Sequence, residues 1–183
     1  MTLLPQRIAA EAARRPATLG SGRLVCIDGP AGSGKTTLAD AVAAALGGAP
    51  VVHLDDLYPG WEGLPQVAAR VLDLLGPLSC DRPGRYRRYD WVAGGYAEEH
   101  EVAPGPWLVL EGVGAGQSGW ARLTTLLVWV EVADDLRLAR GIARDGEAMR
   151  GQWVSWMAQE QAHFARDATR ARADVHVDGA SAY

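Results

Sequence analysis

Short continuous apolar runs alternate along this chain with longer segments in which apolar residues recur every three or four positions. The runs have the length and β-branched content of buried strands, and they lie at residues 23–28, 50–55, 107–112, 124–132 and 173–179. The segments with helical spacing lie at residues 3–15, 35–46, 64–75, 134–144 and 152–172. Strands without polar alternation are typical of a parallel sheet that helices cover on both faces. The pattern therefore predicts an α/β fold.

One charged segment interrupts this pattern, CDRPGRYRRYD at residues 80–90. Its Pro-Gly pair and its arginines predict a turn-rich basic loop. Two interpretations stay open for it. Its aromatic and arginine side chains, with Trp91 beside them, form a pocket for a flat or phosphorylated molecule, or the segment is a mobile surface loop.

Length and composition limit the function classes. The 183 residues, 48% hydrophobic and 22% charged, predict one domain over residues 1–183, in which residues 1–22 are an N-terminal helical extension. The net charge of −4 argues against an extended nucleic-acid-binding face but leaves room for a local phosphate pocket. The longest apolar run, residues 126–130, is too short to cross a membrane.

Cysteine usage and the N-terminus bear on location. Cys26 and Cys80 form neither a disulfide framework nor a metal-binding pattern, and the N-terminus lacks the apolar core of a signal peptide. A reducing, cytoplasmic location is expected. The oligomeric state stays open, a homo-oligomer included.

The sequence GPAGSGKTT at residues 29–37 matches the complete P-loop pattern between a predicted strand and a predicted helix. Glycines let successive backbone N–H groups turn toward one anion, and the N-terminus of the following helix adds its dipole. Lys35, the only lysine of the chain, is expected to reach the outer phosphates of ATP, and the Thr36 hydroxyl to bind Mg²⁺. The expected nucleotide-binding residues are Gly29, Ala31, Gly32, Ser33, Gly34, Lys35, Thr36 and Thr37.

Other P-loop classes fit this chain less well than a small-molecule kinase. The chain contains no asparagine, so it lacks the Asn-Lys-x-Asp stretch with which GTPases usually bind guanine. Its length is also too short for the large oligomeric ATPases. A kinase of the nucleoside or nucleotide type fits the size.

Acidic residues follow two of the predicted strands. Because the carboxyl ends of parallel strands face the ligand crevice, Asp55 is expected near the transferred phosphoryl group, where it orients an acceptor hydroxyl, takes its proton or contacts Mg²⁺. Glu111 ends another apolar run and is expected to hold Mg²⁺ directly or through water. The alternatives are helix capping for Asp55 and Asp56 and a solvated strand-end charge for Glu111.

Arginines recur in the predicted helix 134–144. Arg140 and Arg144 are four residues apart and share a helix face, so they can clamp phosphates in a closing lid. The lid and the helix that follows it are expected at about residues 134–172. The alternative is an exposed, salt-bridged helix face. Trp153 and Trp156 are interpreted as core residues.

Several short motifs, in this order along residues 23–179, resemble the uridine kinase, phosphoribulokinase and pantothenate kinase group of P-loop kinases: GPAGSGKTT, DDLY, YDW, LVLEG, RD with a later RG, and RADV. The glycine loop is specific, and the order of the short pieces carries the rest of the resemblance. It implies a P-loop fold of three layers, a five-stranded parallel sheet with helices on both faces. It also implies that Asp55 meets the acceptor hydroxyl, that Tyr58 and Asp90 belong to the acceptor site, and that Thr36 and Glu111 are the Mg²⁺ partners.

The predicted function is Mg²⁺-dependent phosphoryl transfer from ATP to a hydroxyl of a small molecule, with a nucleoside as the favoured acceptor. Lys35 and Asp55 would carry the catalysis with Arg140 and Arg144 as the lid arginines. Two alternatives stay open. One is a nucleoside monophosphate kinase, and the other is an ATP-binding regulatory protein that transfers no phosphate.

Overall fold

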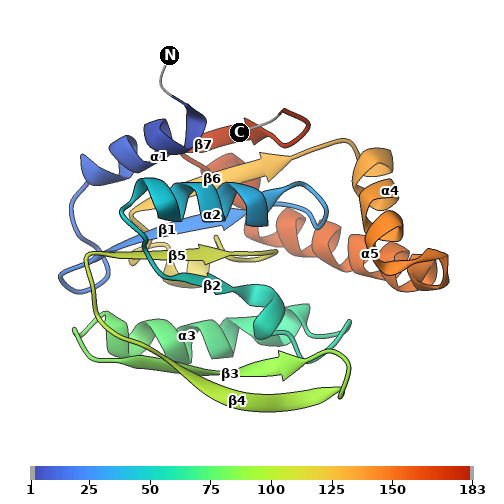
Figure 1. Ribbon diagram of the computed structural model, residues 1–183, viewed down its shortest axis with the longest axis horizontal. Helices are drawn as coiled ribbons and strands as arrows, with labels where there is room; N and C mark the ends of the chain where they lie inside the picture. Colours follow the sequence, from blue (N-terminus) through green and yellow to red (C-terminus); the bar gives the residue numbers. More distant parts are fainter. Residues whose placement is uncertain (1–2, 182–183) are drawn as a thin grey trace.

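A parallel sheet forms the middle layer of the computed structural model, which describes residues 3–181 (Figure 1). Its five strands are β1 (Arg23–Asp28), β2 (Val51–His53), β5 (Trp107–Glu111), β6 (Leu126–Glu131) and β7 (Val175–Asp178). They lie in the order β2-β5-β1-β6-β7, and all neighbours pair in parallel. The predicted five-stranded parallel sheet is confirmed, and β1, β2 and β5 end at one edge.

Helices cover both faces of this sheet (Figure 1). They are α1 (Leu4–Ala13), α2 (Lys35–Ala45), α3 (Val67–Leu78), α4 (Asp134–Asp145), α5 (Arg150–Asp167) and α6 (Thr169–Arg172). Short 3-10 turns connect several of the elements, and these are η1 (Leu54–Asp56), η2 (Leu64–Gln66), η3 (Ser118–Trp120) and η4 (Glu147–Met149).

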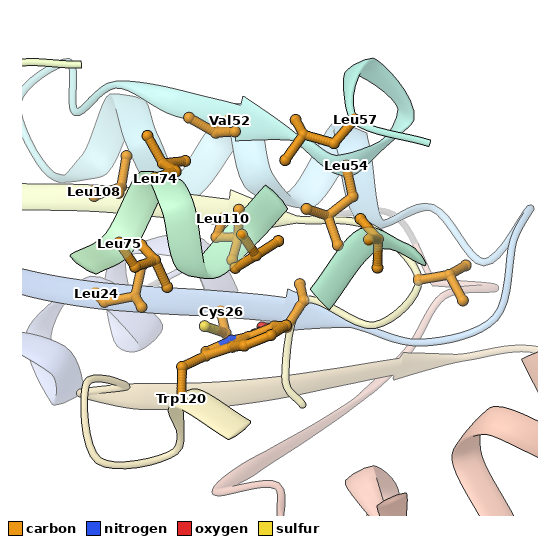
Figure 2. Packing of buried hydrophobic residues seen from close by; sticks show 14 of the residues in the cluster. Leu24, Cys26, Val52, Leu54, Leu57, Leu74, Leu75, Leu108, Leu110 and Trp120 are labelled. Atoms are coloured by element: carbon orange, nitrogen blue, oxygen red, sulfur yellow. The ribbon is translucent and has the colours of Figure 1, made fainter. Parts of the chain in front are cut away.

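Successive residues of the strands point into two separate cores, as the two-residue period of a strand requires. In β1, Leu24 and Cys26 belong to one core, and Val25 and Ile27 belong to the other. The first core lies under α3 and includes Trp120, whose indole lies beside Cys26 (Figure 2). The second core lies under α1 and α2. Burial on both faces is why the strands carry no polar alternation.

The N-terminal helix belongs to this second core. Ile8 and Ala12 of α1 are buried with residues of α2, and Arg15 pairs with Asp174 through a 2.8 Å contact between its Nη1 and the carboxylate. The segment expected as an extension over residues 1–22 is therefore packed on the domain where the structure describes it.

The prediction of a loop over residues 80–90 is wrong. Gly84–Asp90 forms β3, which pairs antiparallel with β4 (Gly95–Val102) in a two-stranded sheet apart from the main one (Figure 1). Ion pairs cross this hairpin between Arg85 and Glu101 (2.7 Å) and between Arg88 and Glu98 (2.6 Å). Ion pairs between oppositely charged side chains connect the two strands, which lack an alternating apolar pattern. The hydrophobic pattern of the sequence therefore did not predict this hairpin.

Most other elements are shifted by a few residues from the sequence prediction, and two of these differences bear on the contacts of the fold. The helix expected over residues 152–172 ends at Asp167, because Ala168 adopts a left-handed conformation with φ of 52°, and α6 follows separately. The break lets Asp167 accept hydrogen bonds from the backbone and hydroxyl of Ser118. The strand expected over residues 50–55 ends at His53, so Asp55 lies in the turn η1. Among residues 3–181, no helix combines the length and apolar character needed to cross a membrane.

Two leucines of α3 offer a matched test of the core beneath the cleft. Leu74 is 0% exposed in the first core, whereas Leu72 of the same helix is 45% exposed. Leu74→Ala is expected to lower the free energy of unfolding by about 2–5 kcal/mol, because it leaves a cavity among packed side chains. Leu72→Ala should change it by less than about 1 kcal/mol. Urea unfolding of both variants measures the difference, and equal losses would contradict this packing.

Candidate active site

A cleft of about 980 Å³ opens where β1, β2 and β5 end. Most of the residues selected from the sequence line it, and these are Ala31, Gly32, Gly34, Lys35, Thr36, Thr37, Asp55, Tyr58, Glu111, Arg140 and Arg144. The other selected residues, Gly29, Ser33 and Asp90, are not among its lining residues. Because the carboxyl ends of the parallel strands meet at one edge of the sheet, side chains that lie far apart in the sequence come together there.

The phosphate loop, residues 29–36, joins β1 to the start of α2 and forms one wall of the cleft. Gly32 has φ of 78°, and a Cβ there would lie 2.7 Å from the carbonyl oxygen of Arg137, so only glycine fits. The Lys35 ammonium donates to the carbonyl of Pro30 (2.9 Å) and so curls over the loop. The buried hydroxyl of Ser33 has no hydrogen-bond partner among the described residues. This cradle suits a group rich in acceptor oxygens, such as a phosphate chain.

Asp28 supports the loop from behind, and it was not selected from the sequence. Its fully buried carboxylate accepts the backbone N–H groups of Gly29 (2.7 Å), Gly114 (2.8 Å) and Gly116 (2.8 Å). Burial raises the pKa of Asp28 to about 6, although these N–H groups favour the charged form. Asp28 thereby ties the phosphate loop to the segment that follows β5.

A buried ion pair anchors the phosphate loop to the two helices of the expected lid. Glu160 of α5 is 1% exposed, and it accepts the backbone N–H of Ala31 at 2.9 Å with one oxygen. Its other oxygen pairs with the guanidinium of Arg137 of α4, which is 5% exposed and also bonds Asp134 (2.8 Å). Desolvation raises the pKa of Glu160, and the Ala31 N–H and the Arg137 charge oppose that shift. The sequence offered no signal for Glu160, which lies 129 residues from Ala31.

Oxygen groups suited to a divalent cation meet at the end of β5. The Thr36 hydroxyl donates to Glu111 (3.1 Å), and both residues line the cleft. Nδ1 of His53 lies 2.6 Å from the same carboxylate oxygen, and this hydrogen bond raises the pKa of His53. Hydroxyl and carboxylate oxygens are the ligand types that Mg²⁺ prefers. Residues 3–181 contain no group of three or more His, Cys, Asp or Glu side chains arranged to hold a metal.

Asp55 opens into the cleft from the turn η1. Asp55 is exposed toward the open cleft, where the surrounding protein atoms desolvate its carboxylate only in part, and this desolvation, followed by the charge of Glu111, raises the pKa of Asp55. The positive charges of Lys35 and Arg144 oppose the rise. The Asp55 carboxylate therefore interacts electrostatically with Lys35 and Arg144, and it binds a proton more tightly than an aspartate at its ordinary pKa.

The two lid arginines line the cleft and already have partners. Arg140 donates to the carbonyl oxygens of Gly32 and Gly179, at 3.2 Å each. Arg144 forms a two-pronged pair with Asp145 through bonds of 2.7 and 3.0 Å. Both side chains therefore line the cleft while they are bonded to groups of the protein itself.

The two residues assigned to the acceptor site by the resemblance differ in position. Tyr58 is buried, donates its hydroxyl to the Val113 carbonyl (2.6 Å) and presents part of its ring to the cleft. Asp90 caps the hairpin turn instead, since its carboxylate accepts the N–H groups of Val92 and Ala93, at 2.9 Å each.

A group of tryptophans, called the tryptophan wall here, also lines the cleft. Four of the seven tryptophans of the chain, Trp61, Trp91, Trp153 and Trp156, line the cleft. The helical spacing of Trp153 and Trp156 predicts that both are core residues. Both are buried, as expected, yet each also lines the cleft. One interpretation of residues 80–90, with Trp91 beside them, was a ligand pocket. Trp91 does line the cleft, whereas Arg85 and Arg88 form ion pairs with glutamates across the hairpin.

Comparisons with known proteins bear on the fold. No protein-family model matches this sequence, and no curated protein matches it significantly. A solved structure described as a possible uridine kinase from Bacillus stearothermophilus is similar, with a TM-score of 0.66, 17% identity, and coverage of 95% of this chain and 97% of that chain. Another, described as a candidate fructose transport system kinase from Silicibacter sp. TM1040, has a TM-score of 0.66, 20% identity, and coverage of 96% and 99%.

At these identities the likeness shows the fold. It confirms the expected P-loop arrangement of a five-stranded parallel sheet between helices, over nearly the whole of both chains. The likeness to a protein described as a possible uridine kinase also agrees with the resemblance that the short motifs carry.

The buried pair behind the phosphate loop gives a test of what holds the loop. Glu160→Leu is expected to lower the free energy of unfolding by about 3–5 kcal/mol, because Arg137 then loses its buried counter-charge and keeps only the exposed carboxylate of Asp134. Adding Arg137→Met should recover much of the loss, since no lone charge remains.

The control is Glu147→Leu, which breaks the exposed Arg150–Glu147 pair and should change stability by less than about 1 kcal/mol. Urea unfolding measures all four proteins. A double variant no more stable than Glu160→Leu would show that the unpaired arginine is not the cause.

Proposed function

We propose that this protein is an ATP-dependent kinase that transfers the γ-phosphoryl group to a hydroxyl of a small, nucleoside-like molecule. The observation that carries the proposal is that one cleft is lined both by the phosphate loop and by the Asp55 carboxylate. A phosphate cradle alone supports nucleotide binding. A carboxylate with raised proton affinity in the same cleft supports transfer to a second molecule.

The nucleotide end of the cleft is built to hold a triphosphate. Backbone N–H groups of the phosphate loop, the N-terminus of α2 and the Lys35 ammonium would face its oxygens. In that state Lys35 would exchange the Pro30 carbonyl for a phosphate oxygen, which is a stronger, charge-assisted partner. When bound, ATP with Mg²⁺ supplies the phosphoryl group and neutralises part of its charge.

Thr36 and Glu111 are the residues that would hold the Mg²⁺. Their 3.1 Å hydrogen bond keeps hydroxyl and carboxylate oxygen adjacent. His53 orients the same carboxylate oxygen through the 2.6 Å contact with Nδ1. An outer partner of this kind fixes a ligand oxygen in place.

Asp55 would orient the acceptor hydroxyl and accept its proton. Because the pKa of Asp55 is raised, its carboxylate is a stronger base than an ordinary exposed aspartate. Arg140 and Arg144, which line the same cleft, would meet the outer phosphates and stabilise charge during transfer. Cys26 and Cys80 are both free thiols, which supports a reducing, cytoplasmic location.

Replacing Lys35 tests the nucleotide end of the cleft. Lys35→Ala is expected to lower acceptor-dependent ADP release by about a hundredfold or more, because it removes a preorganised cation from the transferred group. The assay measures ADP with ATP, Mg²⁺ and a panel of nucleosides, nucleoside monophosphates and sugar phosphates. Arg7→Ala, an exposed cation on α1, is the matched control and should keep full activity. Full activity of Lys35→Ala would contradict the proposal, as would nucleotide binding without turnover on any acceptor.

The pH dependence tests Asp55 as the base. Since its pKa is raised above the ordinary value of 3.8, kcat should fall as the pH drops through the raised pKa and the carboxylate becomes protonated. Asp55→Asn should lose most of the activity and this acid limb together. An unchanged acid limb in the residual activity of Asp55→Asn would assign the titration to another group.

A further inference from the structure

We infer that Asp28 is a positioning residue that couples the phosphate loop to the proposed Mg²⁺ end of the cleft. Its buried carboxylate holds a segment on each side, so a nucleotide in the loop would also order the residues that follow Glu111. The inference rests on the proposed function, in which Thr36 and Glu111 hold the metal ion. Asp28 precedes the P-loop pattern of residues 29–36 and does not line the cleft.

One carboxylate serves three backbone donors from two segments. Oδ1 of Asp28 accepts the N–H groups of Gly29 (2.7 Å), the first residue of the phosphate loop, and of Gly114 (2.8 Å). Oδ2 accepts the N–H of Gly116 (2.8 Å). An ionised carboxylate accepts at both oxygens and donates at neither, which is what three converging N–H groups require.

An asparagine could not replace Asp28 in this arrangement. Its NH₂ group would face at least one of the three backbone donors and leave that donor buried and unpaired. Burial raises the pKa of Asp28 to about 6, while the three N–H groups and the charge of Lys35 oppose that rise. At neutral pH the side chain is therefore mainly ionised, the form that accepts all three bonds.

The segment held by Asp28 directly follows β5, and residues 112–116 are called the exit segment here. Glu111 precedes it, and the Gly112 N–H donates to the Ile27 carbonyl (3.1 Å). Together with the two bonds to Asp28, this contact fixes the exit segment to the end of β1 at three points. Glu111 is 4% exposed, so a displacement of the exit segment would move its carboxylate too.

The exit segment also contacts η1, the turn that carries the proposed base. The Val113 carbonyl accepts the hydroxyl of Tyr58 (2.6 Å), which follows η1. Gly112 has φ of 134°, and a Cβ there would lie 2.7 Å from the Cβ of Leu54, the first residue of η1. Contacts this close transmit a shift of the exit segment to the turn. Asp28 is thus linked to both ends of the cleft.

Two segments held by one carboxylate are expected to order together. When the loop N–H groups face phosphate oxygens, Gly29 is held in place, and through Asp28 the exit segment keeps its position. A coupling between two binding events is reciprocal, so an exit segment ordered by Mg²⁺ at Glu111 would strengthen nucleotide binding in turn. Part of the effect of Mg²⁺ on nucleotide affinity would therefore pass through Asp28.

Calorimetric titration of the full chain with a non-hydrolysable ATP analogue, with and without Mg²⁺, measures this coupling. The readout is the factor by which Mg²⁺ strengthens binding of the analogue. Asp28→Asn should lower this factor about fivefold or more, because the two segments then order separately.

The matched control is Asp174→Asn. Asp174 also accepts a backbone N–H, that of Leu127 (2.8 Å), and pairs with Arg15, but it does not line the cleft. This variant should keep the factor of the unchanged protein. An unchanged factor in Asp28→Asn, or an equal loss in both variants, would overturn the inference.

Hydrogen exchange of the unchanged protein tests the same inference should Asp28→Asn fail to fold. The ATP analogue without Mg²⁺ should slow exchange of the Gly114 and Gly116 amides by about tenfold or more, because binding at the loop holds their acceptor in place. The Leu127 amide, which donates to Asp174, should slow less. Unchanged exchange at Gly114 and Gly116, or equal slowing of all three amides, would contradict the coupling.

ADP release separates this inference from the proposed function. Acceptor-dependent turnover by the unchanged protein, with the Mg²⁺ factor intact in Asp28→Asn, would keep the kinase and overturn the role of Asp28. A factor lost in Asp28→Asn, with no turnover on any acceptor, would keep the role of Asp28 and overturn the kinase. Nucleotide binding that Mg²⁺ does not strengthen in the unchanged protein would overturn both.

Discussion

A single buried carboxylate, that of Glu160, organises the phosphate-loop end of this molecule. It holds the Ala31 N–H in the phosphate loop and the Arg137 guanidinium in α4, so one side chain joins the loop to two helices. Arg137 in turn packs its backbone against Gly32, where a Cβ would not fit. A charge buried this deeply is tolerated only while its partners stay in place. The loop geometry and the positions of α4 and α5 are therefore mutually dependent.

The elements that local pattern could predict are those whose burial is uniform. Strand β1 runs from Arg23 to Asp28, as the apolar run RLVCID predicts, because both of its faces are buried. The hairpin β3–β4 follows a different rule. Arg85 and Glu101 stabilise it across the strands, and such pairs are invisible until the register is known. The end of α5 at Ala168 also depends on distant contacts of Asp167 with Ser118.

The site divides in the same way. Lys35, Asp55 and Glu111 could be selected because a motif or the end of a strand marks each one, and all three line one cleft. Glu160 and the tryptophan wall carry no such mark. Their roles arise from contacts between segments far apart in the chain, and the pattern of Trp153 and Trp156 is that of ordinary helix packing. The charge balance of the cleft likewise exists only after folding.

The hairpin β3–β4 shares no hydrogen-bonded ladder with the parallel sheet (Figure 1). It nevertheless carries Trp91 to the mouth of the cleft. Substitutions in its turn would therefore reshape one part of the cleft without disturbing the register of β1, β2 and β5. Changes in the paired strands would cost more, because Val102 belongs to the first core and Tyr86 packs against it. If the proposed function holds, the turn is the segment through which the acceptor range can vary while the phosphate loop keeps its geometry.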